Sequence, residues 1–163
     1  MEIYKSIYCS TEKDVSEIYP GLWLGNYKAA TNYKFIKKHD IQYIINVSKD
    51  VPNAFDDIDY LHIPIDDDEM CFKDLEKLVK IYDIATDLIN ECISSNKNIL
   101  IHCKRGHHRS ACIVAAYLIK YHGAKYSNAI SYINSIRKCA LVRNTCMMQA
   151  LTKYSQLLDQ INK

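Results

Sequence analysis

The stretch from residue 98 to residue 123 constrains the fold more than any other part of the sequence. It opens with an apolar run of strand type, NILIH at 98–102, passes through a polar loop that contains Gly106, and is almost wholly apolar from Ala111 to His122. A run of that length with no polar face predicts a buried helix, and Gly123 follows it where helices commonly end. A strand, a short loop and a buried helix in this order predict a sheet covered by helices.

The rest of the chain has the same alternation of strand and helix patterns. Short β-branched or aromatic runs predict three further strands, at about residues 22–24, 42–48 and 60–65. Apolar residues spaced by threes and fours predict three amphipathic helices, over residues 74–93, in the segment that Ser127 can cap, and from Met147 to Ile161. We therefore expect a single-domain α/β fold with a mostly parallel sheet of four or five strands flanked by helices.

Composition excludes several classes of protein. The 21 basic and 19 acidic side chains are mixed along the sequence, so no block of charge indicates a nucleic-acid arm or a basic membrane anchor. No apolar stretch approaches the length of a membrane span, and the N-terminus has no signal-peptide pattern. The seven cysteines are odd in number and scattered, mostly in apolar runs. We expect no disulfide framework, and a soluble, cytoplasmic protein in a reducing compartment.

The loop between the strand at 98–102 and the buried helix carries the chemistry. It contains Cys103 followed, after five residues, by Arg109. Cys103 lies where free backbone N–H groups and the helix dipole converge, and Gly106 permits the backbone geometry that a phosphate-binding loop needs. Arg109 can grip two phosphate oxygens at once. Because the same positive surroundings favour a thiolate, we expect Cys103 to be a nucleophile near neutral pH.

The loop has two other interpretations. Cys103 could be an inert buried thiol at a strand end, but the strand, glycine, arginine, hydroxyl and helix occur in the order that the chemistry needs. His102, His107 and His108 could join Cys103 in a metal cluster. Their spacing matches no zinc signature, and a bound metal would consume the thiolate, so we expect no metal.

The sequence resembles a known family at this loop and beyond it. HCKRGHHRS at residues 102–110 resembles the His-Cys-x5-Arg-Ser/Thr signature of the protein tyrosine phosphatase superfamily. Four further segments resemble dual-specificity phosphatases within it: IYPGLWLGNYKAA, DIQYIINVS, YLHIPIDDD and AYLIKYHGAKYSNAISYI. The resemblance covers about residues 18–158, so we expect an N-terminal extension at 1–17 and a catalytic domain at 18–163. It is interrupted at VRNTCMMQAL, where the family usually has Pro-Asn and Gly-Phe pairs.

The resemblance implies a two-step reaction without a metal or cofactor. Cys103 would attack phosphorus, Arg109 and the loop amides would hold the phosphate oxygens, and an aspartic acid would protonate the leaving oxygen. Ser110 would donate a hydrogen bond to the sulfur and make it a better leaving group in the second step. The family's acid comes three residues after the proline of the Ile-Pro segment, which indicates Asp67, with Asp66 and Asp68 as alternatives.

Substrate class is less constrained than chemistry. The chain is too short for the loop that deepens the pocket of tyrosine-specific relatives, so the expected substrates are proteins phosphorylated on Tyr, Ser or Thr. The expected substrate-binding residues are Lys104, Arg105, Gly106, His107 and His108. Because this loop is basic, a phosphoinositide, an inositol pyrophosphate or an RNA 5′-triphosphate end is an alternative substrate. A non-catalytic phosphate-binding module is the alternative from another class, and the oligomeric state, monomer or homodimer, stays open.

Overall fold

The computed structural model describes residues 12–66 and 75–163. The elements of these two ranges, in chain order, are β1 (Val15–Tyr19), β2 (Leu22–Gly25), α2 (Tyr27–Ala30), α3 (Tyr33–Lys38), β3 (Ile41–Asn46), β4 (Asp59–His62), α4 (Leu75–Ser94), β5 (Asn98–His102), α5 (Arg109–His122), α6 (Tyr126–Ile136) and α7 (Cys146–Ile161). The alternation of strands and helices followed by helices alone matches the sequence prediction.

The five strands form one sheet in the order β1-β2-β5-β3-β4. Only β1 runs antiparallel to its neighbour, so the sheet is mostly parallel, as predicted. Strand β5 lies in the middle, with Ile101 paired to Leu24 on one side and to Ile45 on the other. A central parallel strand is covered on both faces, which explains why NILIH is apolar without alternation.

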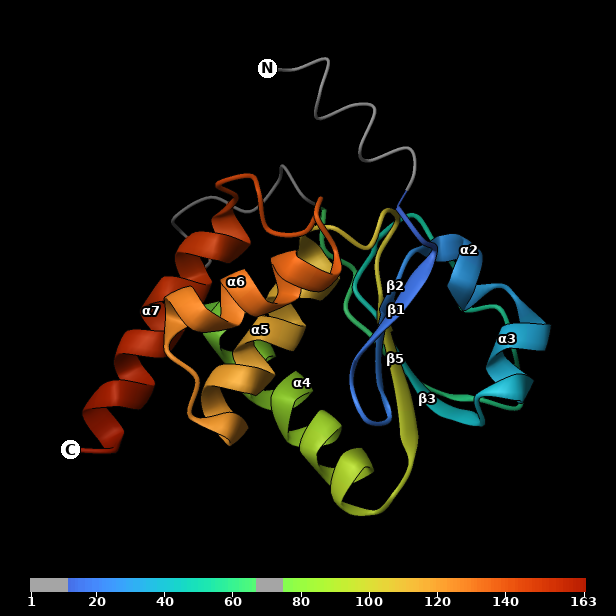
Figure 1. Cartoon of the computed structure of the whole chain (residues 1–163), viewed down its shortest axis with the longest axis horizontal. Helices are drawn as coiled ribbons and strands as arrows, with labels where there is room; N and C mark the ends of the chain where they lie inside the picture. Colours follow the sequence, from blue (N-terminus) through green and yellow to red (C-terminus); the bar gives the residue numbers. More distant parts are fainter. Residues whose placement is uncertain (1–11, 67–74) are drawn as a thin grey trace.

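Helices cover both faces of the sheet (Figure 1). The helices α4, α5, α6 and α7 lie on one face, and the short α2 and α3 lie on the other. Successive strand residues point to opposite faces, so Ile45 and Ile101 join the larger core while Ile44 and Leu100 join the smaller one around Ile36. Within the described residues, no helix is long and apolar enough to cross a membrane.

Helix α5 is the buried helix that the apolar run predicted. Every residue from Arg109 to Ile119 is buried, and the helix ends at Gly123, whose φ of 63° is the left-handed conformation that glycine adopts without strain. Figure 1 shows α5 packed between α4, α6 and the sheet, with its N-terminus next to the end of β5. The fold therefore delivers the loop at 103–108 to the point where a central strand ends and a buried helix begins.

Several local predictions need correction. The strand β1 was not predicted, because an edge strand with one buried residue shows no apolar run. Ser127 lies inside α6 rather than at its cap, which is Lys125. The strand predicted at 60–65 is shorter, ending at His62. The short helices α2 and α3 are capped by Asn26 and Asn32, whose side chains accept backbone N–H bonds.

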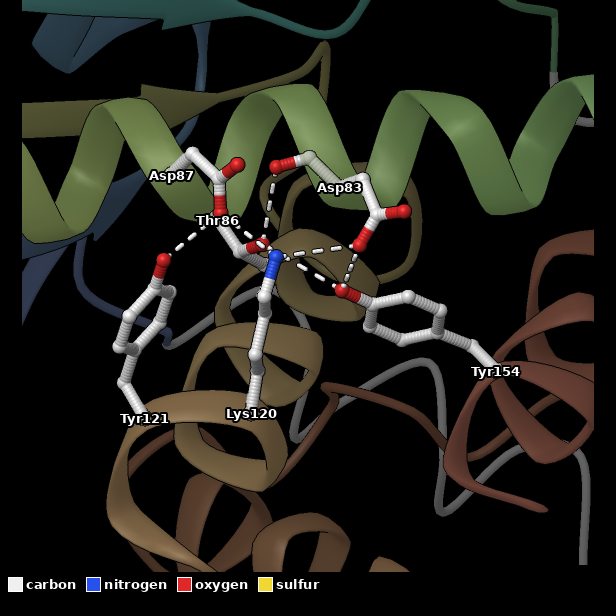
Figure 2. Close-up of polar contacts among 6 residues, drawn as sticks. All are labelled: Asp83, Thr86, Asp87, Lys120, Tyr121 and Tyr154. Carbon is white, nitrogen blue, oxygen red and sulfur yellow. Dashed lines mark hydrogen bonds and ion pairs between the residues drawn. The ribbon is translucent and has the colours of Figure 1, made fainter. Parts of the chain in front are cut away.

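A polar network ties α5 to two of its neighbours (Figure 2). The ammonium of Lys120 on α5 lies 3.1 Å from Asp83 and 2.6 Å from Asp87, both on α4. The hydroxyl of Tyr121 donates to Asp87, and that of Tyr154 on α7 donates to Asp83. The two carboxylates thus share one cation, and each accepts a hydrogen bond from a tyrosine hydroxyl. These contacts connect α4, α5 and α7 at the surface.

We predict that Lys120→Met lowers the free energy of unfolding by about 1 kcal/mol, because two carboxylates lose their shared cation. The matched control is Lys37→Met, which breaks the exposed Lys37–Asp57 pair of two side chains that are each 51% exposed. That variant should lose at most a few tenths of a kcal/mol. Urea unfolding of both variants measures the difference, and equal losses would contradict a cooperative network.

Candidate active site

The sulfur of Cys103 lies at the centre of the candidate site. Cys103 directly follows β5 and is only 2% exposed. Its Sγ accepts two hydrogen bonds of 3.2 Å, one from the backbone N–H of Gly106 and one from the hydroxyl of Ser110 in the first turn of α5. Donors that converge on a sulfur stabilise its ionised form, because a thiolate is the stronger acceptor.

The loop has the shape of an anion-binding nest. Gly106 adopts a φ of +70°, which a side chain would strain, and a Cβ there would lie 2.5 Å from the carbonyl oxygen of Gly25. The loop carbonyls turn outward and find donors on other elements: the N–H of Tyr27 binds the carbonyl of Lys104 at 3.2 Å, and the N–H of Leu141 binds that of His107 at 2.8 Å. With its carbonyls held outside, the loop leaves its N–H groups for an anion.

Arg109 opens helix α5 and is 5% exposed. Its Nη1 donates a 2.9 Å hydrogen bond to the backbone carbonyl of Ile65. Ile65 directly precedes Asp66, the first of the three aspartates from which the acid was predicted, so Arg109 contacts the residue before them. Asp66 is half-buried there, whereas Asp67, the predicted acid, and Asp68 lie outside the described residues.

The basic residues of the loop do not behave alike. The Lys104 ammonium lies 2.9 Å from the Asp50 carboxylate, and both side chains are at least half exposed. The hydrogen bond from Lys104 lowers the pKa of Asp50, and the charge of Arg109 acts in the same direction. Arg105 is exposed, whereas His107 is half-buried. Asp50 at the rim of the site thus pairs with Lys104, one of the basic residues that the sequence predicted to bind the substrate.

The histidines of the loop are largely enclosed. His108 occupies the N-cap position of α5 and is buried. Burial lowers the pKa of His107. Burial also lowers the pKa of His102 to about 4, and its Nδ1 lies 3.4 Å from the carbonyl oxygen of Cys103. His102 is therefore neutral near pH 7, which agrees with a loop-orienting role rather than one in proton transfer.

One group of metal-ligating side chains occurs among the described residues. It consists of Glu12, His107 and Cys139, whose ligand atoms lie within 4.8 Å of one another. Cys139 is disulfide-bonded, so it offers no thiolate to a metal. Of the cysteines that the structure describes, Cys92, Cys103, Cys112 and Cys146 lie outside disulfides.

Two side chains at the site were not predicted. Asp50 pairs with Lys104 across 54 positions of the sequence. Arg137 is fully buried and donates from Nε to the carbonyl of Gly106 at 3.2 Å. Neither belongs to a recognisable motif, and each acts through a tertiary contact, so the sequence alone carried no signal for them.

Comparisons with known proteins agree with the geometry. Residues 22–157 match the family described as "Dual specificity phosphatase, catalytic domain". The chain is 34% identical to the dual specificity protein phosphatase Mpk3 of Drosophila melanogaster over 87% of its own length but only 34% of the relative's. It is 33% identical to dual specificity protein phosphatase 1B of Arabidopsis thaliana over 77% of its length and 72% of the relative's. The crystal structure of DUSP15 superposes with a TM-score of 0.76 at 27% identity, covering 91% of this chain and 94% of that one.

Two glycines with positive φ, Gly106 in the loop before α5 and Gly123 at the end of α5, provide a matched test of the nest. Gly106→Ala should weaken the binding of inorganic vanadate by about a hundredfold, because its Cβ collides with the backbone at Gly25 and displaces the loop. Gly123→Ala, where nothing lies within 4 Å of the added Cβ, should cost only about 1 kcal/mol of unfolding free energy. Calorimetric titration measures both affinities. If Gly106→Ala and Gly123→Ala lost equal amounts of vanadate affinity, the nest around Gly106 would not be the site that binds the anion.

Proposed function

The chain belongs to the dual specificity phosphatase family, and on that premise we propose that it hydrolyses phosphotyrosine, phosphoserine and phosphothreonine in proteins through a cysteinyl-phosphate intermediate. The observation that carries the proposal is the pair of 3.2 Å hydrogen bonds from Gly106 and Ser110 to the sulfur of Cys103. A buried sulfur with two convergent donors at a helix N-terminus is suited to act as a thiolate nucleophile.

In the first step, the thiolate of Cys103 attacks phosphorus in line. The sulfur–phosphorus bond forms while the bond from phosphorus to the substrate oxygen breaks. Asp67 supplies the proton that the leaving oxygen takes up. Arg109 and the loop N–H groups hold the three remaining phosphate oxygens, whose charge they offset in the transition state. In this step Arg109 exchanges its hydrogen bond to the Ile65 carbonyl for the phosphate.

In the second step, water attacks the phosphorus of the intermediate. Asp67, now ionised, takes a proton from that water, and the phosphorus–sulfur bond breaks to release inorganic phosphate. The electron pair of the broken bond returns to the sulfur of Cys103. Ser110 already lies 3.2 Å from this sulfur, and its hydroxyl hydrogen bond stabilises the departing thiolate.

The rim of the site favours a phosphoprotein over a polyphosphorylated small molecule or RNA end. Asp50 places a carboxylate beside Lys104, so that side chain presents no net positive charge. The Asp50 carboxylate would repel a substrate that carries several phosphates. It would repel a single phosphate bound in the nest less strongly. We further propose that the protein acts in the reducing cytoplasm, where the thiol of Cys103 persists and the disulfide of Cys139 would be open to reduction.

Cys103→Ser should abolish hydrolysis of para-nitrophenyl phosphate and retain vanadate binding, while Cys146→Ser, which removes another thiol outside a disulfide, should keep full activity. Asp67→Ala should slow turnover by about a hundredfold and accumulate phosphorylated Cys103. The first step proceeds without an acid because para-nitrophenolate is a good leaving group, whereas the second step lacks the base that takes a proton from water. Intact-mass spectrometry of a quenched reaction detects the adduct. Vanadate binding by the unmutated protein without any turnover would favour the non-catalytic module, and an adduct with Asp66→Ala instead would move the acid to Asp66.

Asp50→Asn should raise kcat/KM for an RNA 5′-triphosphate or an inositol polyphosphate, relative to a phosphotyrosyl peptide, by about three- to fivefold at low salt. The matched control is Asp57→Asn, which removes an exposed carboxylate paired with Lys37. That variant should leave the ratio unchanged. A higher kcat/KM on a polyphosphate than on the peptide for the unmutated protein would contradict the phosphoprotein assignment.

A further inference from the structure

Arg137 is the largest fully buried side chain of the described residues, and its burial needs an explanation. It follows the last turn of α6 as the C-cap. Burying a guanidinium is costly unless its donors are used. Its Nε donates to the carbonyl of Gly106 at 3.2 Å, and its Nη1 donates to the carbonyl of Lys13 at 3.0 Å and to the hydroxyl of Ser16 at 3.1 Å. Arg137 therefore joins the signature loop to the segment that leads into β1.

The contact to Gly106 meets a specific need of the loop. A loop that points its N–H groups at an anion must turn its carbonyls outward, where each requires a donor. Backbone N–H groups serve the carbonyls of Lys104 and His107. The carbonyl of Gly106 receives a side chain instead, at the residue whose φ of +70° shapes the nest and whose N–H binds the sulfur.

The charge of Arg137 also acts on this region. Burial lowers the pKa of Arg137, while electrostatic interactions with Glu12, Cys103 and Asp14 raise it. An arginine stays protonated in proteins, so a fixed cation lies within electrostatic reach of the sulfur. A cation behind the loop favours a thiolate and a bound oxyanion in front of it.

We propose that Arg137 is a positioning residue for the reaction, which holds the Gly106 peptide in the orientation that presents its N–H to the sulfur and to the phosphate. This inference rests on the proposed function. It also connects the segment at Lys13 and Ser16 to the site, because the same guanidinium binds both. Loss of the hydrogen bond would free the Gly106 peptide to rotate and leave its carbonyl without a donor inside the protein.

The test compares Arg137→Met and Arg137→Lys with two controls. Arg143→Met removes an exposed arginine from the same connecting segment, and Ser16→Ala removes one partner of the guanidinium without touching the loop. For each protein, calorimetry gives the vanadate dissociation constant, kinetics give kcat and KM for para-nitrophenyl phosphate, and thermal melts give stability.

Arg137→Met should weaken vanadate binding and lower kcat/KM by about ten- to a hundredfold, because the donors of the nest are misplaced. Arg137→Lys, which keeps the charge and one donor, should lose less, and both controls should stay within about twofold. If Arg137→Met does not fold, the comparison of Arg137→Lys with Ser16→Ala decides: a vanadate affinity equal in the two would overturn the inference.

The outcomes separate this inference from the proposed function. Unchanged affinity and turnover in a folded Arg137→Met protein would overturn the positioning role and leave the phosphatase assignment standing. Vanadate binding without turnover by the unmutated protein would overturn the phosphatase assignment, and a loss of that binding in Arg137→Met would still support the positioning role. An unmutated protein that neither binds nor hydrolyses would overturn both.

Discussion

The account depends on one interaction, the convergence of two hydrogen-bond donors on a buried sulfur. Gly106 within the loop donates to the Cys103 sulfur through its backbone, and Ser110 in the first turn of α5 donates through its hydroxyl. This geometry exists because β5 is a central parallel strand and α5 is a buried helix, so the chain must turn at the edge of the sheet between them. The turn collects free N–H groups at the place where a negative charge is to be held.

The loop does not hold this shape by itself. Its outward carbonyls are bound by three distant elements, the first turn of α2, Arg137 at the end of α6, and Leu141 beyond it. Gly106 is also pressed against the backbone of Gly25 at the end of β2. The local sequence therefore supplies the reactive groups, and the rest of the domain supplies the conformation in which they act. Preorganisation of this kind avoids the cost of rearranging dipoles during the reaction.

The sequence predicted those parts of the molecule that local patterns determine. The apolar run before Gly123 predicted α5, and the spacing of Cys103 and Arg109 predicted a loop that the structure places at the start of that helix. Predictions were wrong or missing where tertiary contacts decide. The edge strand β1 has no apolar run, the cap of α6 is Lys125 rather than Ser127, and Lys104 pairs with Asp50 across the fold. The burial of Arg137 was invisible because a charged residue after a helix ordinarily faces solvent.

The most direct measurement of the central claim is the fate of the phosphoryl group when one of the two donors is removed. Intact-mass spectrometry of a quenched reaction with para-nitrophenyl phosphate compares Ser110→Ala with the unmutated protein. The account predicts that phosphorylated Cys103 accumulates in Ser110→Ala, because the departing sulfur has lost the hydroxyl hydrogen bond that stabilises it. The same low level of adduct in both proteins would contradict it.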